Sequence, residues 1–242
     1  MPNAAIIIPA RYASTRLPGK PLIKINGKTI IQWVYERACL SKLAQDVIIA
    51  TDDERIFQSV KEFGGHVKMT SSSHQSGSDR IAEIAKENPD IDIIVNVQGD
   101  EPLISPESID NAINCLISDK DADISTLIRE ITTKEEILNP NIVKVITDNS
   151  GKALYFSRAA IPYEREADQT KFYAHIGLYA YKRNSLLKMT ELKQTNLEKA
   201  ECLEQLRALQ NGMIIKTVVV DYKPIGIDTP ADLEEFKQRL IN

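Results

Sequence analysis

Apolar runs alternate with amphipathic segments along the first half of the chain. The runs have the length and composition of β-strands, and they lie at residues 4–10, 46–51, 66–70 and 92–98. Segments with apolar residues at helical spacing alternate with them, at residues 28–42, 52–65, 80–88 and 105–119. Apolar strands that alternate with helices are typical of a parallel sheet covered on both faces. The pattern therefore predicts an α/β fold with a mainly parallel central sheet.

The pattern changes at residue 123, where longer strands replace this alternation. The expected elements are strands at 123–131, 141–158 and 174–183, with a hairpin turn at 147–153, a helix at 197–210, a strand at 214–221 and a helix at 229–241. Thr229 and Pro230 suit the N-cap and the first position of the last helix. We expect a single domain over residues 1–242, divided into a main part at 1–122, a smaller strand-rich part at 123–213 and a return to the main sheet at 214–242.

Composition and charge narrow the classes of function. The 242 residues carry a formal net charge of −4, which argues against broad binding of nucleic acid or of anionic membranes. No apolar stretch approaches the roughly 18 residues of a membrane span, and no positive segment opens a signal peptide. Three scattered cysteines without metal-ligand spacing suit buried, reduced thiols. We therefore expect a cytoplasmic protein.

The loop at residues 9–20 follows the first strand and crowds three cations together, Arg11, Arg16 and Lys20. It has neither the G-x-G-x-x-G dinucleotide motif nor the P-loop motif, so any phosphate contact must come from side chains. Arginine can grip phosphate oxygens with two donors, and lysine adds a mobile point charge. The loop is predicted to bind a small anion, and the alternative is an ordinary solvated basic loop.

Two further segments place carboxylates at expected strand ends. In "VNVQGDEP" (95–102) a buried strand runs into Gln98, a glycine and then Asp100, and in "GIDTPADLE" (226–234) Asp228 precedes a helix. Magnesium is usually held by one or two carboxylates together with water and substrate phosphates. Asp100 and Asp228 are therefore candidate metal ligands, and the alternatives are an acidic turn and a helix cap.

The polar segment "SSSHQSGSDR" (71–80) ends in Arg80 at the start of a predicted helix. Such a loop can read a base edge or bind an anion at the helix N-terminus, and the alternative is a flexible capped loop. Neither His74 nor His175 has an acidic partner nearby in the sequence, and no G-x-S-x-G motif is present. A Ser-His-Asp hydrolase is therefore not indicated.

Seven segments taken together closely resemble the 3-deoxy-manno-octulosonate cytidylyltransferase (CMP-Kdo synthetase) family. They are "IPARYASTRLPGKPL", "HQSGSDRIAE", "VNVQGDEP", "ALYFSRAAIPY", "HIGLYAY", "LEQLRALQNG" and "GIDTP", and they run in order through nearly the whole chain. The resemblance implies a Rossmann-like nucleotidyltransferase fold, a homodimer, Mg²⁺ dependence and a reaction. In that reaction CTP and the sugar acid Kdo give CMP-Kdo and pyrophosphate, for lipopolysaccharide synthesis.

The resemblance also implies a role for individual residues. Arg11, Arg16 and Lys20 match the loop that grips the triphosphate, Arg80 and Gln98 match positions near the nucleotide, Asp100 and Asp228 match the metal-binding aspartates, and Arg158, His175, Tyr179, Glu204 and Gln205 match the sugar-acid pocket. Of these, Asp100, Asp228, Lys20 and Arg16 are expected to be catalytic. The strand-rich part at 123–213 would carry sugar binding and dimerisation.

Two small departures from the family pattern leave the sugar preference open. Tyr163 stands where tryptophan is common, and "SGSDR" replaces the frequent "SGTER". Related enzymes accept an amino-sugar form of Kdo, so Kdo and 8-amino-Kdo both stay candidates. A different class of function, a nucleotide-binding regulatory module without turnover, would be expected to lack a metal carboxylate or the sugar-pocket arginine, whereas Asp100, Asp228 and Arg158 are all present.

Overall fold

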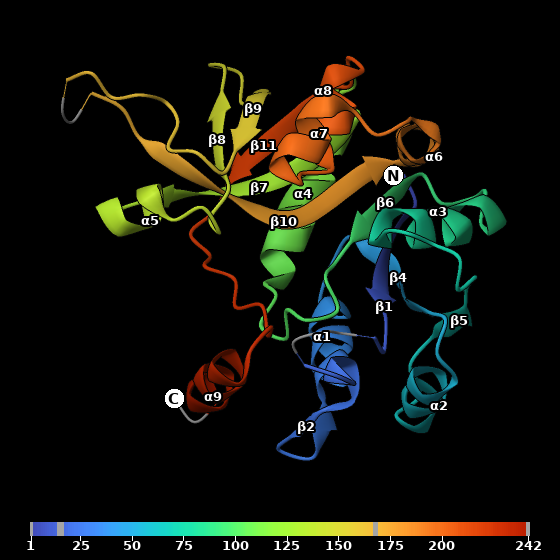
Figure 1. The fold of residues 1–242 in the computed structure, drawn as a ribbon. Coiled ribbons are helices and arrows are strands. Elements are labelled where there is room, and N and C mark those ends of the chain that lie inside the picture. Colours follow the sequence, from blue (N-terminus) through green and yellow to red (C-terminus); the bar gives the residue numbers. More distant parts are fainter. Residues whose placement is uncertain (1, 14–16, 167–168, 241–242) are drawn as a thin grey trace. The chain divides into compact units, whose positions relative to one another are not determined.

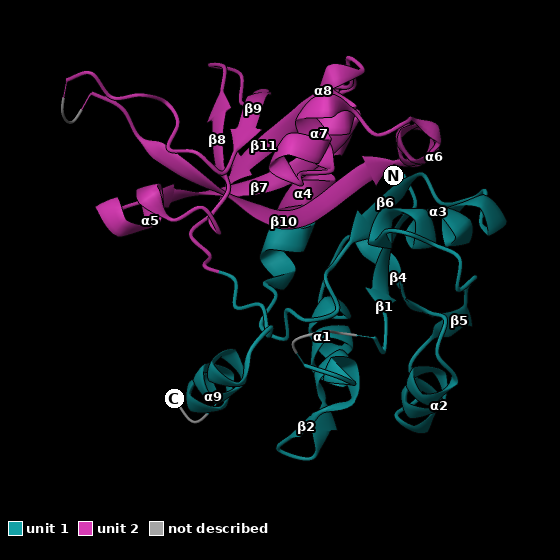
Figure 2. Cartoon of the chain, viewed as in Figure 1, with its two compact units in different colours: residues 1–110, 224–242 teal, residues 111–223 magenta. Residues whose placement is uncertain are grey.

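The computed structural model describes residues 2–13, 17–166 and 169–240. Its elements gather in two compact units, one of residues 1–110 and 224–242 and one of residues 111–223 (Figure 2). The first boundary falls within helix α4, Pro106–Ser118. The expected single domain, with parts at 1–122, 123–213 and 214–242, stays a prediction, since compactness alone does not define a domain.

The first unit is built on a parallel sheet with the strand order β6–β1–β4–β5 (Figure 1). Its strands are β1 Ala4–Ala10, β4 Ala44–Thr51, β5 Val67–Met69 and β6 Ile93–Asn96. In the central strand Ile6 lies opposite both Val47 and Val95. These apolar side chains are buried, as expected for a parallel sheet covered by helices on both faces. The predicted strands of the first half are thereby confirmed.

The helices of this unit begin at capping residues that the sequence makes recognisable. They are α1 Ile30–Ala38, α2 Glu54–Glu62, α3 Gly77–Glu87 and α9 Pro230–Arg239, and the short elements are the 3₁₀ helix η1 Lys20–Leu22 and strands β2 Lys24–Ile25 and β3 Lys28–Thr29. Ser76 and Thr229 form capping boxes with Asp79 and Asp232. The loop before α3 is therefore a capped loop, and the predicted N-cap at Thr229 is confirmed.

The second unit holds a mixed, mainly antiparallel sheet. Its elements are β7 Ile124–Ile131, α5 Lys134–Leu138, β8 Lys144–Thr147, β9 Ala153–Ser157, β10 Phe172–Lys182, α6 Arg183–Glu191, α7 Asn196–Glu201, α8 Gln205–Gln210 and β11 Ile215–Val219. Strand β7 pairs with β10 antiparallel and with β11 parallel, and β8 pairs with β9 and β10 antiparallel. The predicted hairpin turn is confirmed, because Asp148 Oδ1 accepts hydrogen bonds from the amides of Ser150 and Lys152 at 2.8 and 2.9 Å.

Two expectations from the sequence are wrong. The single helix expected at 197–210 is broken into α7 and α8, because Cys202 adopts a left-handed conformation with φ 52° that ends α7. The cysteines are free thiols as expected, but Cys39 and Cys202 are exposed rather than buried. Helical periodicity continues across the break, so hydrophobic spacing alone could not reveal it.

Candidate functional site

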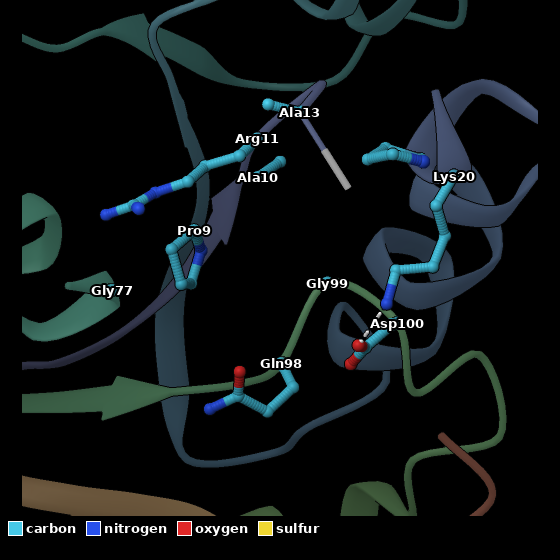
Figure 3. Close-up of a pocket in the computed structure, with 10 residues that line it drawn as sticks. Pro9, Ala10, Arg11, Ala13, Lys20, Gly77, Gln98, Gly99 and Asp100 are labelled. Carbon is cyan, nitrogen blue, oxygen red and sulfur yellow. Dashed lines mark hydrogen bonds and ion pairs between the residues drawn. The ribbon is translucent and has the colours of Figure 1, made fainter. Parts of the chain in front are cut away.

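Two loops of the first unit leave the sheet where its strand order reverses. From β1 the chain continues to β4 and β5 on one side, and it then returns to β6 on the other side of β1. Side chains that follow β1 and β6 therefore emerge next to each other at the carboxyl edge of the sheet. Arg11 and Lys20 follow β1, and Gln98, Gly99 and Asp100 follow β6; they line a cavity of about 410 Å³ (Figure 3).

Two glycines allow the backbone turns that form this cavity. A Cβ on Gly99 would lie 2.9 Å from the carbonyl oxygen of Pro9, so only glycine lets the turn after β6 lie this close to β1. Gly19 has φ 67°, and its amide donates to the Tyr12 carbonyl at 3.2 Å, which closes the loop after β1. Arg16, predicted to bind the triphosphate, lies outside the described residues of this loop.

Lys20, Asp100 and Asp228 converge at the cavity. Lys20 Nζ donates to Asp100 Oδ2 at 2.6 Å and to Asp228 Oδ1 at 2.9 Å. Burial alone would lower the pKa of the Lys20 ammonium, but the charges and hydrogen bonds of the two carboxylates outweigh it and raise the pKa above its usual value. Lys20 is therefore charged at neutral pH, and the expected proximity of the two aspartates is realised in this structure.

Local hydrogen bonds bring the two aspartates together from distant parts of the chain. The amide of Ile227 donates to the carbonyl oxygen of Asp100 at 2.9 Å, which joins the segment before α9 to the turn after β6. The amide of Asp228 donates to Asp232 Oδ2 at 2.9 Å, so the first turn of α9 fixes its backbone. The helix cap Thr229 and the candidate ligand Asp228 are therefore neighbouring residues of one segment. The cap is confirmed, and the metal-binding role of Asp228 stays a prediction.

The donor set of Asp100 and Asp228 fits a divalent cation such as Mg²⁺. Two carboxylate oxygens already approach one cationic atom, Lys20 Nζ, which stands in for a bound ion. Magnesium commonly takes one or two protein carboxylates and completes its shell with water and substrate phosphates. In the described ranges no group of three or more His, Cys, Asp or Glu side chains could hold a metal, so a protein-only cage is not found there.

The neighbouring Glu101 contributes no full charge to this turn at neutral pH. Burial, followed by the nearby charge of Asp100, raises the pKa of Glu101 to about 8. Its side chain therefore carries a proton at pH 7 in most molecules, and Asp100 supplies the negative charge that faces Lys20.

Arg11 lines the cavity and is tied to the loop before α3. Its Nη2 donates to the carbonyl oxygen of His74 at 3.0 Å. The imidazole of His74 contacts the carboxylate of Glu83 on α3, so the fold gives His74 an acidic partner that was not evident near it in the sequence. Burial would raise the pKa of Glu83, but the hydrogen bond to His74 and the charges of His74 and Arg80 lower it overall. A helix brings Glu83 back over the loop, which sequence distance does not reveal.

Arg80 is buried inside the first unit, where it links neighbouring elements. Its side chain is fully buried, Nη1 contacts the hydroxyl of Thr70, and Nη2 forms an ion pair with Asp52 Oδ2 at 3.0 Å. It therefore joins α3 to the ends of β4 and β5, and it does not line the cavity. Its predicted contact with the nucleotide stays a prediction, whereas Gln98 lies in the cavity wall as expected.

The sugar-acid candidates all lie in the second unit, where β10 presents a row of rings on one face. The ring centroids of His175 and Tyr179 lie 5.2 Å apart, and those of Tyr179 and Tyr181 lie 5.8 Å apart. Gly177 lies where the register of β10 against β7 shifts, between Ile176 and Tyr179, and a Cβ added there would meet no atom within 4 Å. The motif "HIGLYAY" therefore places two polar rings next to each other at an irregularity in the strand.

His175 is held as a neutral imidazole. Its Nε2 lies 2.9 Å from the hydroxyl of Thr126, and that hydroxyl also lies 2.8 Å from the carbonyl oxygen of Leu178. Because the hydroxyl proton is donated to the carbonyl, Nε2 carries the imidazole proton and Nδ1 keeps its lone pair. Desolvation lowers the pKa of His175 to about 3, whereas burial followed by the charges of Tyr181 and Glu204 raises that of Tyr179 well above its usual value.

We expect the free energy of unfolding to fall as the pH drops below 6.5, because desolvation lowers the pKa of His175 from 6.5 to about 3. In this range the unfolded chain takes up a proton that folded His175 does not, which costs up to about 1.4 kcal/mol per pH unit. His175→Gln removes this titration, so its stability should depend less on pH between neutrality and about pH 5. Urea unfolding measures both profiles, and equal slopes would contradict the assignment.

Arg158 follows β9 and is fixed by neighbouring backbone groups. Its Nε donates to the Glu201 carbonyl at 2.8 Å, and its Nη1 donates to the Pro140 carbonyl at 3.1 Å. The carboxylate of Glu201 accepts from the Arg158 amide at 2.9 Å and from the Ser157 hydroxyl at 2.6 Å. Among the described residues, the guanidinium is therefore oriented by neutral carbonyls rather than by a paired carboxylate, and these carbonyls do not neutralise its charge.

Lys144 supports this arrangement and was not predicted as a functional residue. Its Nζ donates to the carbonyl oxygens of Asn139, Ile142 and Arg158 at 2.9, 2.6 and 2.6 Å. Lys144 is fully buried, and burial lowers its pKa. A single lysine inside the apolar strand "NIVKVIT" is the signal in the sequence, because lysine is rarely buried without several partners.

Glu204 and Gln205 lie at the start of α8 with different surroundings. Glu204 is the N-cap residue, and its Oε1 lies 3.7 Å from Arg207 Nη2. Gln205 is buried, and its Nε2 has no hydrogen-bond partner among the described residues. The two consecutive side chains therefore have different surroundings.

Comparisons with known proteins match this chain over nearly its whole length. The cytidylyltransferase family profile matches residues 5–217. The 3-deoxy-manno-octulosonate cytidylyltransferase of Geotalea uraniireducens is 51% identical over 97% of this chain and 97% of its own length. That of Geobacter metallireducens is 49% identical over 97% of this chain and 96% of its own length.

A solved structure agrees with the fold. The structure of CMP:2-keto-3-deoxy-manno-octonic acid synthetase complexed with CTP superimposes on this chain with a TM-score of 0.95 and 42% sequence identity. The match covers 99% of this chain and 98% of the other. A Rossmann-like nucleotidyltransferase fold is thereby confirmed. Within the described ranges, every helix is too short or too polar to cross a membrane.

Proposed function

Because this chain belongs to the 3-deoxy-manno-octulosonate cytidylyltransferase family, we propose that it transfers CMP from CTP to the anomeric hydroxyl of Kdo. The products are CMP-Kdo, an activated sugar acid for lipopolysaccharide synthesis, and pyrophosphate. The observation that carries the proposal is the convergence of Asp100 and Asp228 on one cationic atom, Lys20 Nζ, at a cavity lined by Arg11 and Gln98.

The reaction requires that the negative charge of the nucleotide triphosphate be neutralised. A triphosphate carries about four negative charges at neutral pH, and these repel an oxygen nucleophile. Arg11 and Lys20 would bind the phosphate oxygens and stabilise the leaving pyrophosphate, together with Arg16. Asp100 and Asp228 would hold Mg²⁺, which when bound withdraws electron density from the α-phosphate. Gln98 would orient the nucleotide by hydrogen bonding.

The sugar-acid residues would bind an acidic acceptor through distinct chemistries. The oriented guanidinium of Arg158 would pair with the sugar carboxylate. Neutral His175 offers an acceptor at Nδ1, the Tyr179 hydroxyl can donate, and Glu204 and Gln205 would bind hydroxyl groups. No covalent protein intermediate is required, because the attacking hydroxyl displaces pyrophosphate directly, and positioning supplies much of the rate.

The proposal extends to a homodimer in the cytoplasm. The family resemblance implies the dimer, and the three free thiols among the described residues suit a reducing compartment. Size-exclusion chromatography with light scattering measures the assembly state, and a monomer at micromolar concentration would contradict this part of the proposal.

Pyrophosphate release is the direct test of the proposed reaction. The purified chain with Mg²⁺ and CTP should release pyrophosphate when Kdo is added and should not do so without a sugar acid. A parallel reaction with 8-amino-Kdo measures the preference between the two acceptors. Release with 8-amino-Kdo alone would reassign the acceptor, and no release with either would contradict the proposed reaction.

A further inference from the structure

The side chain of Lys20 contacts carboxylates, whereas its predicted role is to bind phosphate. The sequence predicts contact with triphosphate oxygens, but the ammonium bridges the carboxylates of Asp100 and Asp228 at 2.6 and 2.9 Å (Figure 3 shows the first contact). The side chain of Lys20 is 13% exposed, whereas those of Asp100 and Asp228 are 29% and 42% exposed. The ion pairs are therefore partly shielded from solvent. Lys20 pairs with the two carboxylates here, and it is also proposed to bind the triphosphate.

The backbone at Lys20 is held while its side chain can change partner. Its amide donates to the Leu17 carbonyl at 3.1 Å, and Lys20 opens the 3₁₀ helix η1. A lysine side chain has four flexible carbons and a compact charge that accepts several geometries. Because Lys20 also lines the cavity beside Arg11, a phosphate group in that cavity would lie within reach of the ammonium.

The same carboxylate oxygens cannot serve the ammonium and a divalent cation at once. A cation ligated by Asp100 Oδ2 and Asp228 Oδ1 would have to share those oxygens with Lys20 Nζ, which lies within hydrogen-bond distance of both. Two positive charges at such a separation repel each other strongly, particularly where solvent is partly excluded. Divalent binding through these two oxygens therefore requires Lys20 to leave them.

We propose that Lys20 is an exchangeable counter-cation: without nucleotide it occupies the Asp100–Asp228 pair and weakens divalent binding, and phosphate oxygens draw it away to open the pair. This inference rests on the proposed function, in which the two aspartates hold the metal. The consequence is positive coupling, since nucleotide would raise metal affinity and metal would raise nucleotide affinity by the same factor. The pair then loads its divalent cation mainly when a triphosphate is present.

Binding of Mn²⁺ to the nucleotide-free protein tests the exchange without relying on turnover. Free Mn²⁺ is quantified by its solution EPR signal during titration of the full chain. Lys20→Met removes the competing charge and keeps a similar length, so its affinity for Mn²⁺ should be about tenfold higher than that of the wild type. Lys24→Met removes an equal charge from an exposed position in β2 and should leave the affinity within about twofold.

A double variant identifies where the gained Mn²⁺ binds. Adding Asp100→Asn to Lys20→Met should abolish the gain, and a gain that persists would overturn the exchange at this pair. An affinity of Lys20→Met within about twofold of the wild type would also overturn the inference. Lys20→Gln repeats the measurement if circular dichroism shows that Lys20→Met is unfolded.

Pyrophosphate release by the wild-type preparation separates this inference from the proposed function. Wild-type turnover combined with no gain in Lys20→Met overturns the counter-cation role alone. Absence of wild-type turnover with Kdo or 8-amino-Kdo contradicts the proposed reaction, whereas the Mn²⁺ titrations still report whether Lys20 competes at the carboxylates. A further titration with CTP, corrected for Mn²⁺ bound by CTP itself, should show a smaller difference between Lys20→Met and the wild type.

Discussion

We expect Asp100→Asn to lower the rate of pyrophosphate release by roughly 10²–10³-fold while the protein stays folded. Asparagine keeps the size of the side chain and one oxygen, but it removes the charge that pairs with Lys20 at 2.6 Å and that would hold the divalent cation. The partly exposed ion pair contributes up to about 1 kcal/mol to stability, so loss of activity should far exceed loss of folding. Initial rates at saturating CTP, Kdo and Mg²⁺ measure the effect.

An exposed carboxylate in the same unit provides the matched control. Asp90 lies in the turn before β6 with an exposed side chain, so Asp90→Asn makes the same chemical change away from the cavity. Its rate should stay within about twofold of the wild type, because an exposed distant charge is screened by salt. A rate of Asp100→Asn within about threefold of the wild type would refute the metal role of this carboxylate.

We expect Arg158→Ala to raise the KM for Kdo by about 10- to 100-fold and to leave CTP binding near the wild-type value. The Nε and Nη1 hydrogen bonds to the carbonyls of Glu201 and Pro140 orient the guanidinium without neutralising it. Alanine removes the charge proposed to pair with the sugar carboxylate, whereas the nucleotide residues lie elsewhere in the chain. Steady-state kinetics in Kdo and equilibrium dialysis with CTP separate the two effects.

Loss of another arginine in the second unit controls for general damage. Arg129 forms hydrogen bonds to both carboxylate oxygens of Glu136, at 2.8 and 3.0 Å, and is not among the sugar-acid candidates. Arg129→Ala should lower the thermal midpoint without a specific rise in the KM for Kdo. If Arg158→Ala weakens CTP binding as much as it weakens use of Kdo, the assignment of Arg158 to the sugar acid is wrong.

Local elements could be predicted from the sequence because their causes lie close together in the chain. Continuous apolar runs identified β1, β4 and β6, since buried parallel strands need apolar side chains on both faces. Thr229 and Pro230 identified the start of α9, since these residue types favour the N-cap and the first position of a helix. The break between α7 and α8 was missed because it depends on a left-handed residue without a glycine signal.

The candidate site was predicted in part. The resemblance identified Asp100, Asp228 and Lys20, but only the folded chain reveals that the lysine bridges both aspartates. Arg80 was assigned by motif to the nucleotide, whereas the fold buries it against Asp52 and Thr70. Lys144 was overlooked, although it supports the segment that carries Arg158. In each of these three cases, the sequence did not reveal which groups from distant parts of the chain contact the charged side chain.

The sequence by itself determined the class of fold, the alternation of strands and helices in the first half of the chain, the cap of α9 and the residue types of the site. These properties follow from spacing and composition over a few neighbouring residues. Only the tertiary structure decided the partners of Lys20, Arg80 and His74, because a buried charge is stabilised by whichever opposite charges or carbonyls folding brings near it. Which groups become these partners depends on the order of the strands in the sheet and on the paths of the loops. Both are set by interactions between distant parts of the chain.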